Sequence, residues 1–248
     1  MLDDIELEEL EWEYFKMLKL YLKQDFTHIL EGLDSRLKIK ENWYENFIQT
    51  ARKGYKASDL DTGAERIFHH FFAPIFKFPN SAPVGADLMY ELPEAILHVD
   101  IKTALIDNPA DYKGKINVAT NQTSYGKKAN IRTNLPEYYL KNKPCLTYAI
   151  QIIHEHAKPG IKALILISIP NGQLFSIYGK SVIKSGKGGY EKGRDFRYHY
   201  AEEPYFKLLK EKYKKDIFRI EFLYLDKDLL SKKIAVFDNA PIWKQTQD

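Results

Sequence analysis

Two aspartates and a lysine between positions 87 and 102 have the chemistry of a metal-dependent nuclease site. An apolar, partly β-branched run around Asp100 and Lys102 predicts a strand. Because side chains alternate between the faces of a strand, Asp100 and Lys102 project to the same side while Ile101 points into the core. A hairpin with the preceding strand brings Asp87 beside them.

These residue types suit the hydrolysis of a phosphodiester. Two carboxylates provide the oxygen ligands that a hard divalent cation prefers. The lysine adds positive charge where a phosphate or an attacking water would sit. The alternative is that Asp100 and Lys102 are solvated charges at a strand end, as in most Asp-x-Lys tripeptides. Their position within apolar strands, where unpaired charges are costly, favours a metal-dependent phosphodiesterase.

The composition is ordinary for a globular protein and excludes several other classes. Hydrophobic residues make up 44% of the 248 positions and charged residues 29%, so the chain can bury a sizeable core. No apolar run approaches a membrane span, and the acidic N-terminus differs from the basic start of a signal peptide. The single cysteine, Cys145, excludes an internal disulfide and a multi-cysteine zinc site. We therefore expect a cytoplasmic protein.

The net charge of +3 does not by itself indicate a nucleic-acid partner. Its distribution is more informative, because local patches determine the field that a polyanion meets. Acidic residues concentrate before residue 15, whereas Lys127-Lys128 and the stretch 180–197 are basic.

Hydrophobic periodicity and turn residues predict a central order of helix, three strands, helix and strand. The expected helices are 4–31, 41–52, one from 58 to near Pro74 or Pro79, 146–157 and 204–215. The expected strands are 84–91, 95–106, 115–125, 161–169, 174–178, 217–225 and 233–237. No repeat or linker divides the chain, so we expect one domain over residues 1–248.

This order, with Asp87 and Asp100-x-Lys102 on adjacent strands, resembles the nuclease core of the PD-(D/E)xK superfamily. Within it the chain is most similar to type II restriction endonucleases of the EcoRV type, over residues 58–170. The resemblance implies an α/β (α+β) fold with a central mixed sheet flanked by helices, and a prokaryotic source. It divides the chain into a helical, dimerising region (1–57), a catalytic core (58–170) and a DNA-recognition extension (171–248).

The resemblance also implies roles for the site residues. Asp87, Asp100 and the backbone carbonyl of Ile101 would hold Mg²⁺, for which Mn²⁺ can substitute, and Lys102 would orient the attacking water. Ala86 replaces the proline of the motif, the interval between the aspartates is slightly shorter, and the helix position that carries a glutamate in EcoRV is His69. Glu65 lies one turn earlier on the same helix face, so it takes over that role, or the role is absent.

Two polar segments are candidates for DNA contacts. The loop of Asn121, Gln122, Thr123 and Ser124, followed by Lys127, resembles the minor-groove loop of the EcoRV type. A second, glycine-rich loop over 184–194 offers cations for phosphates or guanine edges, and its members are Lys184, Lys187 and Arg194. The plain alternatives are a polar surface turn and a solvated loop. A nucleotide-binding loop is disfavoured, because Gly-Lys-Gly-Gly lacks the Gly-Lys-Ser/Thr ending.

Other motifs have structural interpretations. His154-Glu155-His156 lacks a third zinc ligand, and we expect solvated histidines at a helix end. His69-His70 and Cys145 are expected to serve packing.

We therefore expect a homodimeric, Mg²⁺-dependent type II restriction endonuclease that cuts a short palindrome in double-stranded DNA and leaves 5′-phosphate and 3′-hydroxyl ends. The first helix is the expected dimer contact, because a two-fold DNA site is most simply matched by a two-fold dimer. The alternatives are a repair or recombination nuclease and a catalytically inactive DNA-binding protein. The intact set of Asp87, Asp100 and Lys102 argues against the inactive protein.

Overall fold

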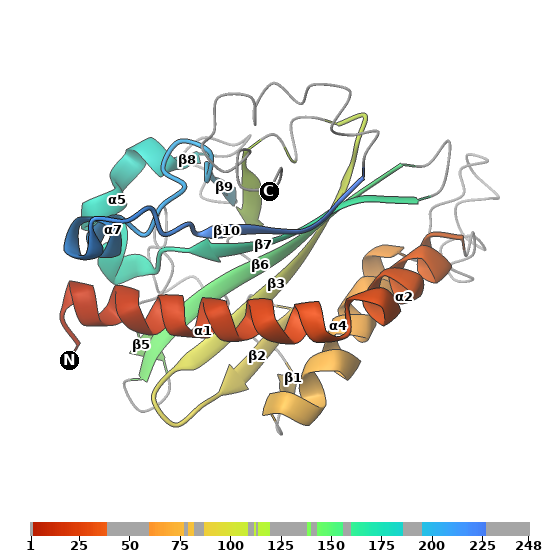
Figure 1. The fold of residues 1–248 in the computed structure, drawn as a ribbon, viewed down its shortest axis with the longest axis horizontal. Coiled ribbons are helices and arrows are strands. Elements are labelled where there is room, and N and C mark those ends of the chain that lie inside the picture. The colour runs from red at the N-terminus through yellow and green to blue at the C-terminus, as the bar shows by residue number, and fades with distance from the viewer. Residues whose placement is uncertain are drawn as a thin grey trace.

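The central feature of the protein is a mixed, seven-stranded β-sheet (Figure 1). The structure is a computed structural model that describes residues 2–38, 60–76, 79–81, 87–108, 112, 114–119, 138–139, 143–155, 160–185 and 195–226. The strands of the main path are, in spatial order, β1 (Pro79–Ser81), β2 (Leu88–Glu91), β3 (Ile96–Leu105), β6 (Lys143–Glu155), β7 (Gly160–Ile169) and β10 (Ile220–Leu225), and β5 (Tyr138–Tyr139) also pairs with β6.

The sheet is mixed because one central pair of strands is parallel. β3 runs parallel to β6, whereas β2 pairs with β3, β7 with β6 and β10 with β7 in antiparallel fashion. This arrangement confirms the predicted α/β fold with a mixed sheet.

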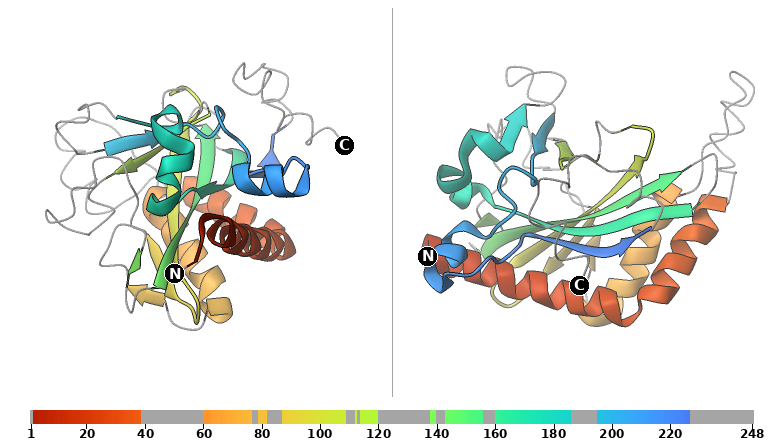
Figure 2. Two further views of the ribbon diagram at one scale, coloured as in Figure 1. Left: turned by 90° about the vertical axis from the view of Figure 1, so that its left-hand side faces the viewer. Right: turned by 45° about the horizontal axis from the view of Figure 1, so that its top comes forward.

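Three helices cover one face of the sheet (Figure 2). They are α1 (Asp4–Gln24), α2 (Phe26–Lys38) and α4 (Leu60–Phe76). A capping box between Asp3 and Glu6 begins α1 by satisfying backbone donors that the first turn leaves open. α4 buries a residue at every fourth position against the sheet, and this stripe is Leu60, Ala64, Phe68, Phe72 and Phe76.

A smaller, three-stranded sheet lies on the opposite face (Figure 2). Its order is β4 (Ile116–Ala119), β9 (Asp195–Tyr198) and β8 (Ile183–Ser185). A 3₁₀ turn (Gly172–Leu174), α5 (Phe175–Val182) and α7 (Lys207–Tyr213) complete the described fold. Among the helices that the structure describes, none has the length and apolar character needed to cross a membrane.

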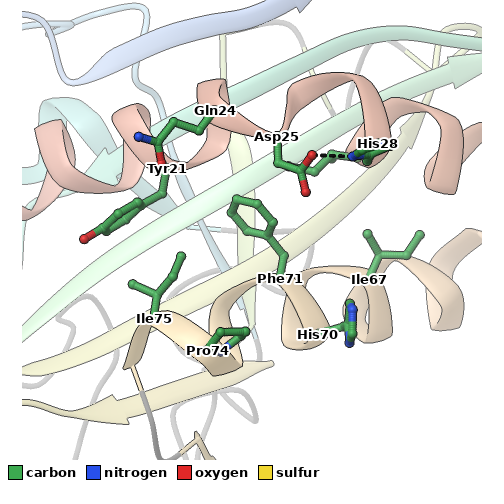
Figure 3. A pocket seen from close by; sticks show the side chains of 10 residues that line it. Tyr21, Gln24, Asp25, His28, Ile67, His70, Phe71, Pro74 and Ile75 are labelled. Carbon is green, nitrogen blue, oxygen red and sulfur yellow. Dashed lines mark hydrogen bonds and ion pairs between the residues drawn. The ribbon is translucent and has the colours of Figure 1, made fainter.

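The helix layer contains a groove of about 390 Å³ between α1–α2 and α4 (Figure 3). Tyr21 and His28 face Ile67, Phe71 and Ile75 across it. Asp25, at the break between α1 and α2, holds the His28 ring and raises the pKa of that histidine. None of the residues predicted to act in catalysis lines this groove.

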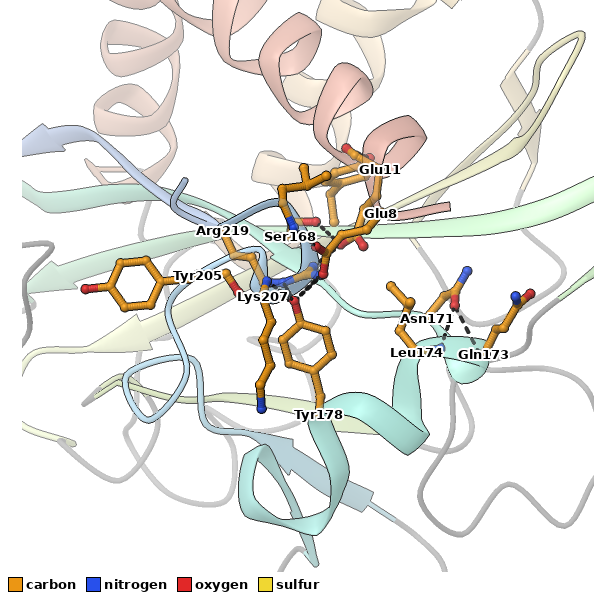
Figure 4. A network of polar contacts seen from close by, with 12 residues as sticks. Glu8, Glu11, Ser168, Asn171, Gln173, Leu174, Tyr178, Tyr205, Lys207 and Arg219 are labelled. Carbon is orange, nitrogen blue, oxygen red and sulfur yellow. Dashed lines mark hydrogen bonds and ion pairs between the residues drawn. The ribbon is translucent and has the colours of Figure 1, made fainter. Parts of the chain in front are cut away.

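A buried ion cluster connects α1 to β7, to α5 and to the residue that precedes β10 (Figure 4). Arg219 is fully buried and donates hydrogen bonds to Glu8 (Nη2 to Oε1, 2.9 Å) and to Glu11. The Tyr178 hydroxyl of α5 accepts from Arg219 and donates to Glu8, while Ser168 of β7 donates to Glu11. Burial raises the pKa of Glu11 to about 7, although Arg219 opposes the shift.

Several predicted elements are confirmed and three are corrected. β2, β3, β7, α4, α7 and β10 lie where strands and helices were predicted, and β4 accounts for the first part of 115–125. The helix predicted over 4–31 breaks at Asp25 into α1 and α2. The predicted strand at 174–178 is wrong, because these residues end the 3₁₀ turn and begin α5. The helix predicted over 41–52 and the strand over 233–237 lie outside the described residues.

The helix predicted over 146–157 is wrong, because these residues belong to β6. Residues 144–154 are all buried and mostly apolar, and the polar members of this run, Thr147, Gln151 and His154, do not alternate with apolar residues. Such a run does not distinguish a strand buried on both faces from a buried helix. As a consequence His154 is a buried strand residue, not a solvated histidine at a helix end. The prediction for Cys145 is confirmed, since it is fully buried against Met89 and Ile96.

Candidate active site

The β2–β3 hairpin positions the two aspartates. Its antiparallel register pairs Leu88 with Val99, and one further step places Asp87 opposite Asp100. The turn is closed by a 2.9 Å hydrogen bond from the Leu92 N–H to the Ala95 carbonyl. The predicted hairpin is therefore confirmed, and it brings both carboxylates to one side of the sheet.

Direct contacts join the members of the site. Asp87 Oδ2 accepts a hydrogen bond from the backbone N–H of Ile101 at 2.6 Å. Lys102 Nζ lies 2.9 Å from Asp100 Oδ2. Asp100 is 3% exposed, whereas Asp87 and Lys102 are partly exposed and so remain accessible to a ligand. The Ile101 side chain is buried in the core on the other face, as predicted.

The electrostatics of the site favour a cation between the carboxylates. Burial raises the pKa of Asp100 to about 7, the Lys102 ammonium opposes the shift, and the neighbouring Asp87 adds to it. A bound divalent cation would relieve both the desolvation of Asp100 and the repulsion from Asp87. The donor set therefore fits a hard cation such as Mg²⁺.

The backbone of Ile101 is oriented to supply a further oxygen ligand. In an antiparallel ladder, one residue directs its N–H and its C=O to the same neighbouring strand. Because the N–H of Ile101 meets Asp87, its carbonyl also faces the Asp87 side, just beyond the first residue of β2. Two carboxylates and one carbonyl can thus converge there.

Glu65 does not complete this set in the described part of the chain. Within the residues that the structure places, no group of three or more His, Cys, Asp or Glu side chains could hold a metal ion. Glu65 and His69 are both exposed on α4. A role for Glu65 in catalysis stays a prediction.

The neighbouring strand β6 adds residues that were not predicted from the sequence. In its parallel register with β3, Ala149 lies beside Asp100 and Gln151 beside Lys102. Gln151 is 1% exposed and accepts a hydrogen bond from the Tyr200 hydroxyl at 3.2 Å. Gln151 was missed because the segment was predicted to be a helix, in which it would not align with Lys102.

His98 and Thr147 form another buried pair on the same face of the sheet, two residues before Asp100 and Ala149 in their strands. Their Nε2 and Oγ1 atoms have no hydrogen-bond partner. Burial lowers the pKa of His98 to about 4, so this histidine is neutral at physiological pH.

Most of the predicted DNA-contact residues lie outside the described residues. These are Asn121, Gln122, Thr123, Ser124, Lys127, Lys187 and Arg194. Lys184 is placed in β8, where its register partner is Arg197 of β9. The described strands nevertheless fix where both segments begin. Ala119 pairs with Asp195 and Ser185 with Phe196, so β4 and β8 finish at the same end of the small sheet.

Sequence comparison assigns the chain to a family. The family model for the N-terminal domain of the type II restriction enzyme MwoI matches residues 3–158, and the model for its central domain matches residues 161–225. The chain belongs to the MwoI family of type II restriction enzymes. It is therefore a type II site-specific endonuclease, as the sequence predicted.

Solved structures of two restriction endonucleases have a similar fold to this MwoI-family chain. The structure of the restriction endonuclease BglI bound to its DNA recognition sequence superposes with a TM-score of 0.59 at 14% identity, covering 91% of this chain and 93% of BglI. The tetrameric restriction endonuclease SfiI bound to cognate DNA gives a TM-score of 0.54 at 14% identity, covering 92% and 87%. No curated protein sequence matches the chain. The resemblance to restriction endonucleases is confirmed, whereas its EcoRV-type subdivision stays a prediction.

Proposed function

We propose that this MwoI-family chain hydrolyses double-stranded DNA at a short palindrome in a Mg²⁺-dependent reaction and leaves 5′-phosphate and 3′-hydroxyl ends. The observation that carries the proposal is the convergence of Asp87, Asp100 and Lys102 on one hairpin, with the 2.6 Å and 2.9 Å contacts described above. This set combines hard oxygen donors with one positively charged group.

Each residue has a role that follows from its position. Asp87, Asp100 and the Ile101 carbonyl would hold the cation, which would stabilise charge on the phosphate and help to activate the attacking water. Lys102 is held by Asp100 and supplies positive charge to the phosphate and a donor that orients the attacking water. Glu65 is proposed as an additional group of the site, in the role of the helix glutamate of the EcoRV type.

The small sheet is proposed to carry sequence recognition. BglI and SfiI were both solved with DNA bound, and we infer that this chain likewise binds double-stranded DNA. β4 precedes the polar segment over 121–127 and β8 leads into the basic segment over 184–194, and both strands end at the same end of the β4–β9–β8 sheet. Two segments that begin at one end of a sheet can contact neighbouring phosphates and base edges of the same duplex.

A homodimer remains the proposed assembly. A palindrome presents the same half-site twice, and a two-fold dimer matches it with two copies of one site. SfiI is described as tetrameric, so a dimer of dimers is the alternative. Sedimentation of the purified protein with and without DNA distinguishes a dimer from a tetramer.

Digestion of plasmid DNA tests the proposed reaction. Purified protein is incubated with plasmid in Mg²⁺, Mn²⁺, Ca²⁺ or EDTA, and the ends of the products are sequenced. We expect discrete fragments in Mg²⁺ and Mn²⁺ that share one sequence around each cut and can be ligated without phosphorylation. A smear of random ends would instead indicate a processing nuclease, and retarded but intact DNA would indicate a binding protein.

A further inference from the structure

The hydroxyl of Tyr200 lies at a junction of three chain segments. Tyr200 is 0% exposed, and its single hydroxyl proton faces two acceptors, the Tyr112 carbonyl oxygen at 2.9 Å and Gln151 Oε1 at 3.2 Å. The contacts therefore join β6 to the segment before β4 and to the segment after β9.

These segments are the base of the small sheet. Ile116 of β4 and Ile183 of β8 both pair with Tyr198 of β9, at the end opposite to Ala119, Ser185 and Asp195. The Ala201 N–H also donates to the Gly114 carbonyl at 3.1 Å. The base of the small sheet is thus fixed to the main sheet, while β4 and β8, which precede the segments proposed to contact DNA, finish at its other end.

The attachment point lies beside the catalytic lysine. Gln151 is the register partner of Lys102 in the parallel β3–β6 pair, so the two side chains project from the same face of the sheet. Asp100 holds the Lys102 ammonium from the same strand. A shift of the small sheet that moves Tyr200 would therefore also move the Gln151 side chain, which lies next to Lys102.

We propose that Tyr200 and Gln151 are positioning residues that couple the small sheet to the active site, so that cognate DNA aligns Lys102 for cleavage. The inference rests on the proposed function, because it assigns DNA recognition to the small sheet. Neither side chain is a catalytic residue. Their contact transmits the position of one sheet to the other.

The test is single-turnover cleavage at saturating enzyme, with a cognate duplex and a duplex changed at one base pair. Tyr200→Phe removes only the hydroxyl, and Gln151→Met keeps the size of the side chain while removing its acceptor. Tyr198→Phe is the matched control, since Tyr198 is equally buried but its hydroxyl has no hydrogen-bond partner.

We expect Tyr200→Phe and Gln151→Met each to slow cognate cleavage by about tenfold, with little change in cleavage of the altered duplex or in binding of either duplex. The double variant should be no slower than the slower single variant, because both substitutions break the same contact, the one between Tyr200 and Gln151. Tyr198→Phe should behave as wild type.

Two results would overturn the coupling. One is cognate cleavage at the wild-type rate by folded Gln151→Met. This variant alone tests the coupling if Tyr200→Phe does not fold. The other is an equal loss on both duplexes with weaker binding, as expected from a purely structural contact. Failure of the proposed function is recognised separately, because wild-type protein would then cut neither duplex.

Discussion

The carboxylate of Asp87 is fixed by the backbone of Ile101, whose N–H donates to Asp87 Oδ2 at 2.6 Å. This bond extends the β2–β3 ladder by a side chain at the position where the strand pairing stops. It therefore aims Asp87 at the strand that carries Asp100 and Lys102, and it leaves the carbonyl of Ile101 beside the same carboxylate. The geometry expected of a two-carboxylate metal site is thus built into the hairpin.

Replacing Asp100 by Asn should change the pH dependence of stability in the absence of divalent cations. Burial raises the pKa of Asp100 to about 7 from the model-compound value of 3.8, so the folded protein keeps a proton that the unfolded chain loses. Wild-type stability should then fall as pH rises from about 4 to about 7, and Asp100→Asn escapes this loss. We expect the free energy of unfolding of the variant, relative to wild type, to rise by roughly 1–3 kcal/mol between about pH 5 and pH 8.

Urea denaturation in EDTA at a series of pH values measures this difference. Asp107→Asn is the control, because Asp107 is exposed in the turn after β3. A stability difference between Asp100→Asn and wild type that does not change with pH would contradict the assignment of a buried carboxyl group with a raised pKa.

Glu65→Gln should slow cleavage strongly, whereas His69→Ala should have little effect. The reason is that Glu65 lies one helical turn from His69, the position at which the EcoRV-type pattern has a glutamate. Both residues are exposed on α4, so neither change should lower stability by more than about 0.5 kcal/mol. Cleavage rates of the two variants at saturating Mg²⁺ show whether Glu65 or His69 is needed for catalysis. Loss of activity in His69→Ala with normal Glu65→Gln would reverse the assignment.

Arg194→Ala and Lys187→Ala should have different effects on DNA affinity. A guanidinium matches the O6 and N7 acceptors of guanine, so Arg194→Ala should cost about 1–3 kcal/mol of specific binding and relax the preferred sequence. A lysine that contacts phosphate adds affinity without reading bases, so Lys187→Ala should weaken binding to all duplexes and reduce the salt dependence. Affinities for cognate and scrambled duplexes over a salt series measure both effects. If neither affinity changes, base recognition lies elsewhere in the chain.

Arg219→Met should destabilise the protein by about 3–5 kcal/mol, because it leaves two buried carboxylates without their cation. Adding Glu8→Gln and Glu11→Gln to this variant should recover much of the loss, since the uncompensated charges are then removed. Arg66→Met is the control, as Arg66 is exposed on α4. Chemical denaturation gives the free energy of unfolding of wild type, Arg219→Met, the triple variant and Arg66→Met. Equal stability of Arg219→Met and Arg66→Met would show that the cluster adds nothing to the fold.

The catalytic hairpin was predictable because its signals are local. Strand alternation places Asp100 with Lys102, and a short turn places Asp87 opposite them, so neither step needs a distant part of the chain. β6 was mistaken for a helix because a strand buried on both faces has no polar alternation. Because Gln151 lies in β6, the same error kept Gln151 out of the predicted site.

The small sheet was not predictable for another reason. Its strands are three or four residues long and come from segments near 117, 184 and 196. Their pairing depends on contacts between residues far apart in sequence, of which short strands carry little trace. The contact between Tyr200 and Gln151 likewise joins residues 49 positions apart.

The most direct test of the central claim compares cleavage with binding in Asp87→Ala, Asp100→Ala and Lys102→Ala, with Asp107→Ala as the control. Each protein is titrated with a duplex that wild type cuts, and cleavage at saturating Mg²⁺ is then followed under single-turnover conditions. We predict no measurable cleavage by the three site variants and wild-type cleavage by Asp107→Ala. DNA affinity should be retained or increased in the two aspartate variants, because a negative charge beside the phosphate is removed. Near-normal cleavage by either Asp87→Ala or Asp100→Ala would contradict the account.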